Sequence, residues 1–307
     1  MKILRGLSEI TGTGPGAITV GTFDGVHLGH IEIISRLKEI AAEKGLCTTL
    51  VTFYPHPRLI VHGGINPVKL LTSQEEKLHL LDTTGLNQVL IIPFDESFSN
   101  MDYRSFIQDI LLDRLKMKAM IVGYDHSFGK NREGTYANIQ SLSTKLGFSV
   151  EKVGPLQLDG KNIGSSKIRE MLQLGAVEAA TESLGRRYSL CGTVIHGVAR
   201  GRSLQFPTAN LRLEYENKLI PENGVYAVDV EYNGSVFKGM LNIGFKPTFE
   251  TGHAFTIEVH ILEFNKDIYG EQLKVIFKKR LRSEKKFENK EALIAQLEID
   301  KKKSLKL

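Results

Sequence analysis

The 307-residue sequence contains no tryptophan, only two cysteines, and no apolar run long enough to cross a membrane. Cys47 and Cys191 stand far apart and outside any CxxC motif, so the sequence supports neither a disulfide framework nor a zinc knuckle. We expect both thiols to be reduced and to pack as small hydrophobes. The N-terminus, MKILRGLSEI, is too short and polar for a signal peptide, so we expect a cytoplasmic protein without a membrane partner.

Hydrophobic residues make up 41% of the chain and charged residues 24%, which is ordinary for a globular protein. A chain of this length usually forms two domains, because single cores rarely grow beyond about 250–300 residues. The formal charge is +5, and residues 273–307 alone hold twelve Lys or Arg against five Asp or Glu. This basic C-terminus favours a solvated helix end over a nucleic-acid-binding tail, since lysines suit the negative end of a helix dipole.

From residue 17 to about residue 185, apolar runs alternate with amphipathic segments. This order predicts a parallel sheet covered by helices, an α/β domain of Rossmann-like type. Ser73 and Glu76 form a predicted capping box, and glycines at 45, 85 and 147 mark helix ends. The expected strands are residues 17–23, 47–53, 88–94 and 118–123, and the expected helices are residues 30–45, 73–85, 102–115 and 135–147.

After Gly185 the pattern changes to short alternating segments separated by Gly, Pro and Asn. It predicts a small β-barrel, closed or nearly so, followed by a C-terminal amphipathic helix over roughly residues 289–302. We therefore expect an α/β domain of residues 1–184 and a β-barrel domain of residues 185–307. The expected barrel strands are residues 188–197, 224–234, 235–244, 254–264 and 271–280.

One stretch, GTFDGVHLGH at residues 21–30, follows the first expected strand and opens the first helix. In parallel α/β sheets, ligands bind beyond the carboxyl ends of the strands, where helix N-termini favour phosphate. His27 and His30 are one helical turn apart and can converge on one small anion, so the stretch predicts binding of a nucleoside triphosphate. Two alternatives stay open: a zinc site completed by His56 or His62, or ordinary surface histidines.

GTFDGVHLGH resembles the HxGH signature of nucleotidyltransferases. With TFYPHP (52–57), GYDHSFGKNREG (123–134) and GSSKIREML (164–172), the first half resembles the prokaryotic FAD synthetases, which usually join an FMN adenylyltransferase to a C-terminal riboflavin kinase. The second half resembles that kinase through GRSLQFPTANL (201–211), PENGVYAV (221–228), NIGFKPTF (242–249), EVHILEF (258–264) and DIYG (267–270). The resemblance covers essentially the whole chain, with its motifs in the expected order.

The resemblance implies an enzyme of FAD biosynthesis that adenylylates FMN with ATP, giving FAD and pyrophosphate, and that also phosphorylates riboflavin. Its small-molecule partners would be ATP, FMN, FAD and riboflavin, with Mg²⁺ as the metal. One alternative is an adenylyltransferase whose barrel binds flavin without phosphorylating it. Another is a flavin-sensing regulator whose basic tail contacts RNA, which salt-dependent RNA affinity would reveal.

In the first half, the resemblance assigns catalysis to His27, His30 and Arg169. Ser165 and Ser166 would cap the helix that carries Arg169 and donate to phosphate, although the same pattern is typical of any capped helix. Asp125 has the alternative of a turn residue, and Arg58 that of a solvated cation. The implied ATP-binding residues are Gly21, Phe23, Asp24, Gly29, Ser165 and Ser166, and the implied flavin-binding residues are Arg58, Asp125 and Phe128.

In the second half, the resemblance makes Glu258 the general base on the terminal ribityl hydroxyl, although a lone Glu in a strand is ordinarily an exposed residue. Thr208 and Asn210 supply the hard oxygen ligands that suit Mg²⁺. The other implied residues are Gly192, His196, Gly197 and Gly201 for ATP and Arg282 for flavin.

Several positions depart from the family pattern. His126 stands where Phe is expected, Gly164 replaces a Ser, and Ser166 stands where Thr is usual. Val198 replaces a polar residue and Gln205 replaces a turn glycine in the kinase half, where a positive φ would strain any other residue. We therefore expect the kinase to be weaker than the adenylyltransferase.

Overall fold

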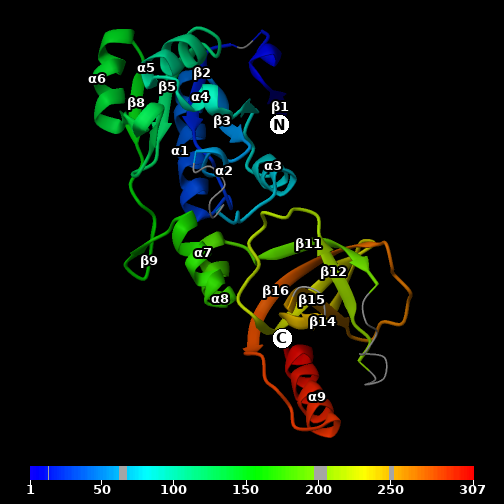
Figure 1. The fold of residues 1–307 in the computed structure, drawn as a ribbon. Helices are drawn as coiled ribbons and strands as arrows, with labels where there is room; N and C mark the ends of the chain where they lie inside the picture. Colours follow the sequence, from blue (N-terminus) through cyan, green and yellow to red (C-terminus); the bar gives the residue numbers. More distant parts are fainter. Residues whose placement is uncertain (13, 62–67, 197–205, 249–251) are drawn as a thin grey trace. The chain divides into compact units, whose positions relative to one another are not determined.

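The computed structural model describes residues 1–12, 14–61, 68–196, 206–248 and 252–307, and it divides into two compact units, Met1–Ser165 and Ser166–Leu307 (Figure 1). The first unit is built on a six-stranded sheet in the order β1-β4-β3-β2-β5-β8, and all of its strand pairs are parallel. Its strands are β1 (Lys2–Arg5), β2 (Gly16–Val20), β3 (Cys47–Tyr54), β4 (Gln88–Pro93), β5 (Met117–Val122) and β8 (Ser149–Lys152).

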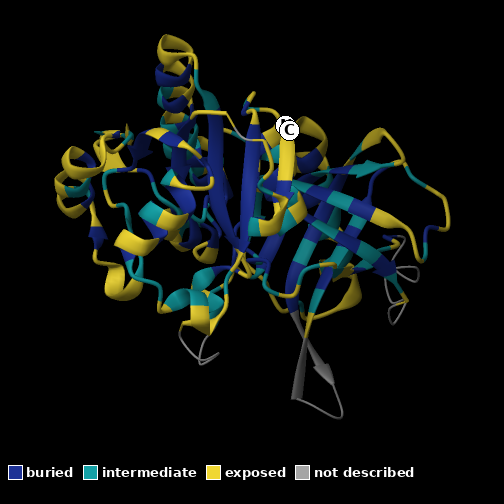
Figure 2. Cartoon of the chain, turned by 90° about the horizontal axis from the view of Figure 1, so that it is seen from above, coloured by how far each residue is buried: buried dark blue, intermediate teal, exposed yellow. Residues whose placement is uncertain are grey.

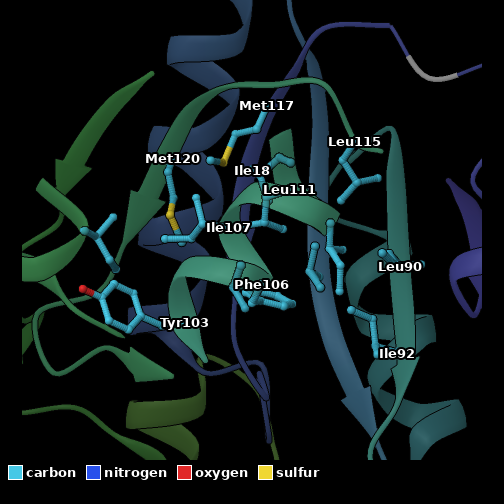
Figure 3. Close-up of a cluster of buried hydrophobic side chains, with 14 of the residues drawn as sticks. Ile18, Leu90, Ile92, Tyr103, Phe106, Ile107, Leu111, Leu115, Met117 and Met120 are labelled. Atoms are coloured by element: carbon cyan, nitrogen blue, oxygen red, sulfur yellow. The ribbon is translucent and has the colours of Figure 1, made fainter. Parts of the chain in front are cut away.

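The central strands of this sheet are buried along almost their whole length (Figure 2). Alternate residues face opposite sides, as strand geometry requires. Ala17, Leu50 and Val89 pack in a cluster with Leu37 of helix α1 (Leu28–Lys44) and Leu81 of helix α3 (Gln74–Asp82). The residues that follow them, Ile18, Val51 and Leu90, pack in a second cluster with Phe106, Ile107 and Leu111 (Figure 3).

Several helix ends of this unit lie where the sequence predicts caps, but the helix expected to run to Gly85 ends at Asp82, with Thr83 as its C-cap. Ser73 and Glu76 form the capping box of α3, and Gly45 and Gly147 end α1 and α6 in the left-handed region. The helices are α1 (Leu28–Lys44), α2 (Pro57–Ile60), α3 (Gln74–Asp82), α4 (Glu96–Ser99), α5 (Tyr103–Ser105) and α6 (Tyr136–Leu146), with a π-helical η2 (Phe106–Leu112) and 3₁₀ turns η1 (Leu7–Glu9) and η3 (Lys130–Arg132). Two small hairpins complete it, β6 (Ser127–Phe128) with β7 (Gly134–Thr135) and β9 (Gln157–Leu158) with β10 (Lys161–Asn162).

The strand order places a topological switch point beside β2. After β2 the chain continues to β3 and β4 on one side, then returns to β5 on the other side. Ligands of open α/β sheets bind at such a point, outside the carboxyl ends of the strands. The loops that follow β3, β2 and β5 are therefore neighbours at one edge of the sheet.

The second unit is a closed antiparallel barrel in the order β11-β12-β15-β14-β13-β16. In β11 and in the first half of β16, buried and half-buried residues alternate, because one face of each strand lines the core. Tyr226 and Phe277 fill this core, with ring centroids 5.1 Å apart in an edge-to-face arrangement. The strands are β11 (Ser189–Ile195), β12 (Ala209–Leu213), β13 (Gly224–Tyr232), β14 (Ser235–Thr248), β15 (Gly252–Ile261) and β16 (Gln272–Arg282).

Three helices belong to the barrel unit, α7 (Ser165–Gln173), α8 (Val177–Leu184) and α9 (Lys290–Lys306). Backbone hydrogen bonding attaches α7, since Glu222 N–H donates to Leu172 C=O at 2.9 Å. The predicted fold class is thus confirmed: a Rossmann-like parallel sheet, then a β-barrel with a C-terminal helix. Contacts within the chain divide it between Ser165 and Ser166, which groups α7 and α8 with the barrel. The boundary at residues 184 and 185, which concerns the two functional domains, stays a prediction.

Candidate active sites

The stretch from Gly21 to His30 forms the loop between β2 and α1, at the switch point of the sheet. His27 is the N-cap of α1, and the Nδ1 atom of its ring accepts a hydrogen bond from the backbone N–H of His30 at 3.3 Å. The rings of His27 and His30 stack, with centroids 3.6 Å apart and planes 16° apart. The loop therefore brings two imidazoles together at the positive end of a helix dipole.

The cap also fixes the tautomer of His27. A ring nitrogen that accepts a hydrogen bond carries no proton, so in the neutral ring the proton lies on Nε2. His27 is buried, at 5% exposure, which holds the ring in this orientation. The side chain is consequently a hydrogen-bond donor at Nε2 and an acceptor at Nδ1.

Backbone of unusual conformation shapes the loop. Phe23 and Val26 have φ values of 50° and 38°, which bulky residues rarely adopt, and the ring of Phe23 lies 4.7 Å from that of His30. A Cβ atom on Gly29 would lie 3.2 Å from two atoms of the His27 ring. Gly29 is thus needed for the ring of His27 to lie against the first turn of the helix.

Asp24 is a buried anchor of this loop. Its carboxylate accepts hydrogen bonds from the backbone N–H groups of Leu71 at 3.0 Å and Thr72 at 3.2 Å. Its backbone carbonyl accepts from the hydroxyl of Ser165 at 2.9 Å. Asp24 and Ser165, both predicted ATP-binding residues, therefore lie together in the first unit and hold the loop in place.

Lys77 of α3 lies below the same loop and was not among the predicted residues. It is 6% exposed, and burial lowers the pKa of its ammonium from 10.5 to about 8, against the raising effect of the Asp24 carboxylate. The sequence carries a signal for it, because Lys77 shares the buried face of α3 with Leu78 and Leu81. A charged residue on an apolar face indicates a buried partner.

The predicted flavin-binding residues follow β3 and β5, the strands on either side of β2. Arg58 is exposed in α2, where the Nδ1 atom of His56 caps the helix by accepting from the Arg58 N–H at 3.2 Å. Asp125 is exposed just beyond β5. Phe128, in β6, packs edge-to-face on Phe106, with ring centroids 5.2 Å apart, so it is a partly buried residue at the edge of the hydrophobic core.

His126 occupies the same loop as Asp125. The Nε2 atom of its ring is buried and has no hydrogen-bond partner among the described residues. Burial, with a smaller effect of the Arg132 charge, lowers the pKa of His126 from 6.5 to about 4. The ring is therefore neutral at physiological pH and packs beside Phe128, at 5.3 Å between centroids.

Helix α7 carries the remaining residues predicted for the first site. Ser165 begins the helix, Ser166 is exposed, and Arg169 is 8% exposed one turn further along. Positions four apart lie on the same helix face, so Ser165 and Arg169 share one face of α7. Arg169 belongs to the second compact unit and Ser165 to the first.

In the barrel, three predicted residues lie together on adjacent strands. The Thr208 hydroxyl donates to Oε2 of Glu258 at 3.0 Å, and Asn210 pairs with Glu258 across β12 and β15. Asn242 pairs with Glu258 from the other side, across β14 and β15, although it was not predicted. Paired residues of an antiparallel ladder project from the same face, so a carboxylate, a hydroxyl and two amides gather there.

The other predicted residues of the barrel are more dispersed. His196 follows β11 and stacks on Tyr269, with ring centroids 3.8 Å apart, while Gly192 lies within β11. Arg282, at the end of β16, donates from Nε to Oδ2 of Asp300 in α9 at 2.8 Å. Gly197 and Gly201 lie outside the described residues, as do Val198, Gln205 and His62.

Comparison with known proteins matches the two units to two families. Residues 11–167 match the family model described as FAD synthetase, and residues 184–307 match that described as riboflavin kinase. A bifunctional riboflavin kinase/FMN adenylyltransferase from Bacillus subtilis is 38% identical over 292 residues, which is 94% of this chain and 91% of the relative. One from Listeria monocytogenes is 39% identical over 283 residues, covering 92% and 89%. The chain belongs to the bifunctional riboflavin kinase/FMN adenylyltransferase family.

A solved structure has the same fold over the whole chain. It is described as a macrolide-efflux protein from Streptococcus pneumoniae, is 28% identical, covers 100% of both chains and has a TM-score of 0.90. Efflux belongs to the description of that protein and is not assigned to this chain. Within the described part of this family member, no helix has the length and apolar character needed to span a bilayer.

The zinc alternative for the two histidines gains no support from this geometry. The described residues contain no group of three His, Cys, Asp or Glu side chains that could hold a metal ion. His27 uses its Nδ1 atom to cap α1, and His56 uses its own to cap α2. In this family member, His27 and His56 each cap the start of a helix that follows a strand of the sheet.

Proposed function

We propose that the loop of residues 21–30 is the adenylyl-transfer site of this enzyme. Membership of the family gives the chain two activities, FMN adenylylation with ATP and riboflavin phosphorylation. The observation that carries the site is the stacked pair His27 and His30 at the start of α1, beside the topological switch point. No other described loop of the sheet combines a helix N-terminus with paired imidazoles.

In this reaction an FMN phosphate oxygen attacks the α-phosphorus of ATP, and pyrophosphate leaves. Negative charge grows on the α-phosphate oxygens in the transition state, where donors fixed beforehand stabilise it most. Nε2–H of His27 and the ring of His30 supply such donors. From its motif, Arg169 would neutralise the leaving pyrophosphate. Arg58 and Asp125 would bind the flavin nucleotide from the loops after β3 and β5.

For the kinase, Glu258 would take the proton from the terminal ribityl hydroxyl as that oxygen attacks the γ-phosphorus of ATP. The donor set fits Mg²⁺, because Thr208, Asn210 and Glu258 place hard oxygen atoms side by side. Thr208 and Asn210 would hold the metal. When bound, Mg²⁺ would neutralise phosphate charge.

The test of the first site is His30→Ala, assayed for FAD formation from FMN and Mg-ATP. Losing one transition-state donor typically lowers the rate about a hundred- to a thousandfold. His79→Ala, at an exposed histidine of α3, is the matched control and should leave the rate unchanged. Hydrogen exchange of peptides covering the buried strand β5 in the same samples reports whether the first unit is folded. FAD formation by His30→Ala at the wild-type rate would show that the loop does not serve the α-phosphate.

A further inference from the structure

Lys77 is a buried ammonium that the proposed chemistry does not use. It projects from α3, on the buried face of that helix, and is 6% exposed. Lysines are almost never fully buried unless their charge is paired or hydrogen bonded. The contacts of Lys77 should therefore explain why the site contains it.

The Nζ atom of Lys77 donates to the backbone carbonyl of Thr22 at 3.2 Å and to Oγ1 of Thr52 at 3.1 Å. The Thr52 hydroxyl itself donates to the Thr22 carbonyl at 3.2 Å. We call this set the Lys77 triangle. It joins α3, β3 and the first turn of the loop after β2, three elements that meet only through tertiary packing.

The triangle ends one peptide bond before the strained part of the loop. Phe23 directly follows Thr22 and has a φ of 50°, while its ring lies 4.7 Å from the ring of His30. Backbone in such a region persists only where the surroundings hold it, and it tends to occur at functional sites. Leu71 and Thr72, just before α3, hold Asp24 on the far side of Phe23. Residues 71–77 therefore fix both neighbours of Phe23.

We infer that Lys77 is a positioning residue for adenylyl transfer: with Thr52 it holds the Thr22 carbonyl, and through Phe23 it holds the ring of His30. The inference rests on the proposed role of His30 at the α-phosphate. It assigns to Lys77 no direct contact with substrate, because the ammonium is directed at two protein oxygens. Loss of Lys77 should therefore reduce kcat for FAD formation and leave KM for ATP and FMN nearly unchanged.

The test uses the full chain and compares four variants. Lys77→Met removes the ammonium and keeps an unbranched side chain; Thr52→Val removes the hydroxyl and keeps the shape; Thr52→Ser restores a hydroxyl. Lys38→Met is the matched control, because exposed Lys38 also donates to a backbone carbonyl, that of Thr84 at 2.8 Å. Each is assayed for FAD formation, and hydrogen exchange of peptides covering β5 measures whether the first unit is folded.

We expect Lys77→Met to lower kcat about a hundredfold, the effect of misplacing a catalytic group by roughly 1 Å, with each KM within about threefold. Thr52→Val should lower kcat about tenfold, and Thr52→Ser and Lys38→Met should keep the wild-type value. A further variant combines Lys77→Met with Thr52→Val. Because both side chains act on the Thr22 carbonyl, its kcat should be no lower than that of Lys77→Met alone. If Lys77→Met fails to fold, the contrast between the Thr52 variants decides.

Two results would overturn the inference. The first is a wild-type kcat in folded Lys77→Met and Thr52→Val. The second is a raised KM for ATP with unchanged kcat in Lys77→Met, which would make Lys77 a phosphate ligand. His30→Ala is measured beside them. If His30→Ala is also fully active, the proposed role of the histidines is what fails. If His30→Ala is inactive while the triangle variants are normal, only the inference about Lys77 fails.

Discussion

Replacing His126 with phenylalanine is expected to remove one source of the acid sensitivity of the first unit. The structure holds the pKa of His126 at about 4, against 6.5 for an ordinary histidine, because the ring is buried and faces Arg132. Between pH 6.5 and pH 4, His126 is protonated in the unfolded chain and stays neutral in the folded chain. The free energy of unfolding therefore falls as the pH falls from 6.5 towards 4.

The two pKa values set the size of this effect. Integrating the linkage relation from pH 7, this one group lowers the free energy of unfolding by about 2 kcal/mol at pH 5 and about 3 kcal/mol at pH 4. Phenylalanine does not titrate, so it contributes no change in the free energy of unfolding with pH. It also removes the buried Nε2 atom, whose lack of a hydrogen-bond partner lowers the free energy of unfolding by about 1–3 kcal/mol at any pH. His126→Phe should thus be more stable than wild type at pH 7, and the difference should grow on acidification.

Hydrogen exchange measured by mass spectrometry suits this comparison, because it reports on each unit separately. Peptides covering β5, which are buried, give the unfolding free energy of the first unit at pH 4, 5 and 7. Peptides from β16 in the barrel serve as the internal control and should not differ between the proteins. A stability difference in β5 that stays constant from pH 7 to pH 4 would refute the assignment of a neutral, buried His126.

Three further predictions concern the barrel and the division of the chain. Glu258→Gln should abolish FMN formation from riboflavin and leave FAD formation from FMN unchanged; chromatography of the flavins checks both, and untouched kinase activity would remove Glu258 as base. Asp300→Ala removes the fully buried carboxylate that pairs with Arg282, so it should lower the free energy of unfolding of the barrel by about 3 kcal/mol, as measured by urea unfolding. A protein truncated to residues 1–183 should adenylylate FMN without phosphorylating riboflavin. A protein truncated to residues 1–165 lacks Arg169, so it should fold but form little FAD. A folded but inactive protein of residues 1–183 would contradict the predicted boundary.

The central sheet could be predicted because its strands are short apolar runs between helical patterns, and the same periodicity places the loop of residues 21–30 at a strand end. Strand β1, at Lys2–Arg5, escaped prediction since only Leu4 of its residues is buried. Strand β12 was likewise not named among the barrel strands. Its burial pattern lacks a clean alternation, so pairing with β11 and β15 decides its conformation.

The residues of the sites divide in the same way. His27, His30 and Glu258 stand in motifs and could be named from the sequence alone, but their roles stay predictions. Asn242 opens the motif of residues 242–249, but its place opposite Glu258 could not be predicted, because only the register of β14 on β15 sets it. Thr52 is an ordinary strand residue until the loop after β2 folds over it. Tertiary pairing creates these contacts, and no local pattern encodes it.

The contacts around the loop of residues 21–30 show how one stretch would serve both folding and the proposed catalysis. The Nδ1 atom of His27 satisfies a backbone donor in the first turn of α1, so the start of the helix and the orientation of the ring are set by one hydrogen bond. That bond leaves Nε2 as the donor, which is the state that a growing negative charge requires. Stacking on His27 and contact with Phe23 then limit the rotation of His30. Donors held in place before the substrate binds need no reorganisation during the reaction, so under the proposed role of the two histidines the capping geometry itself would contribute to stabilising the transition state.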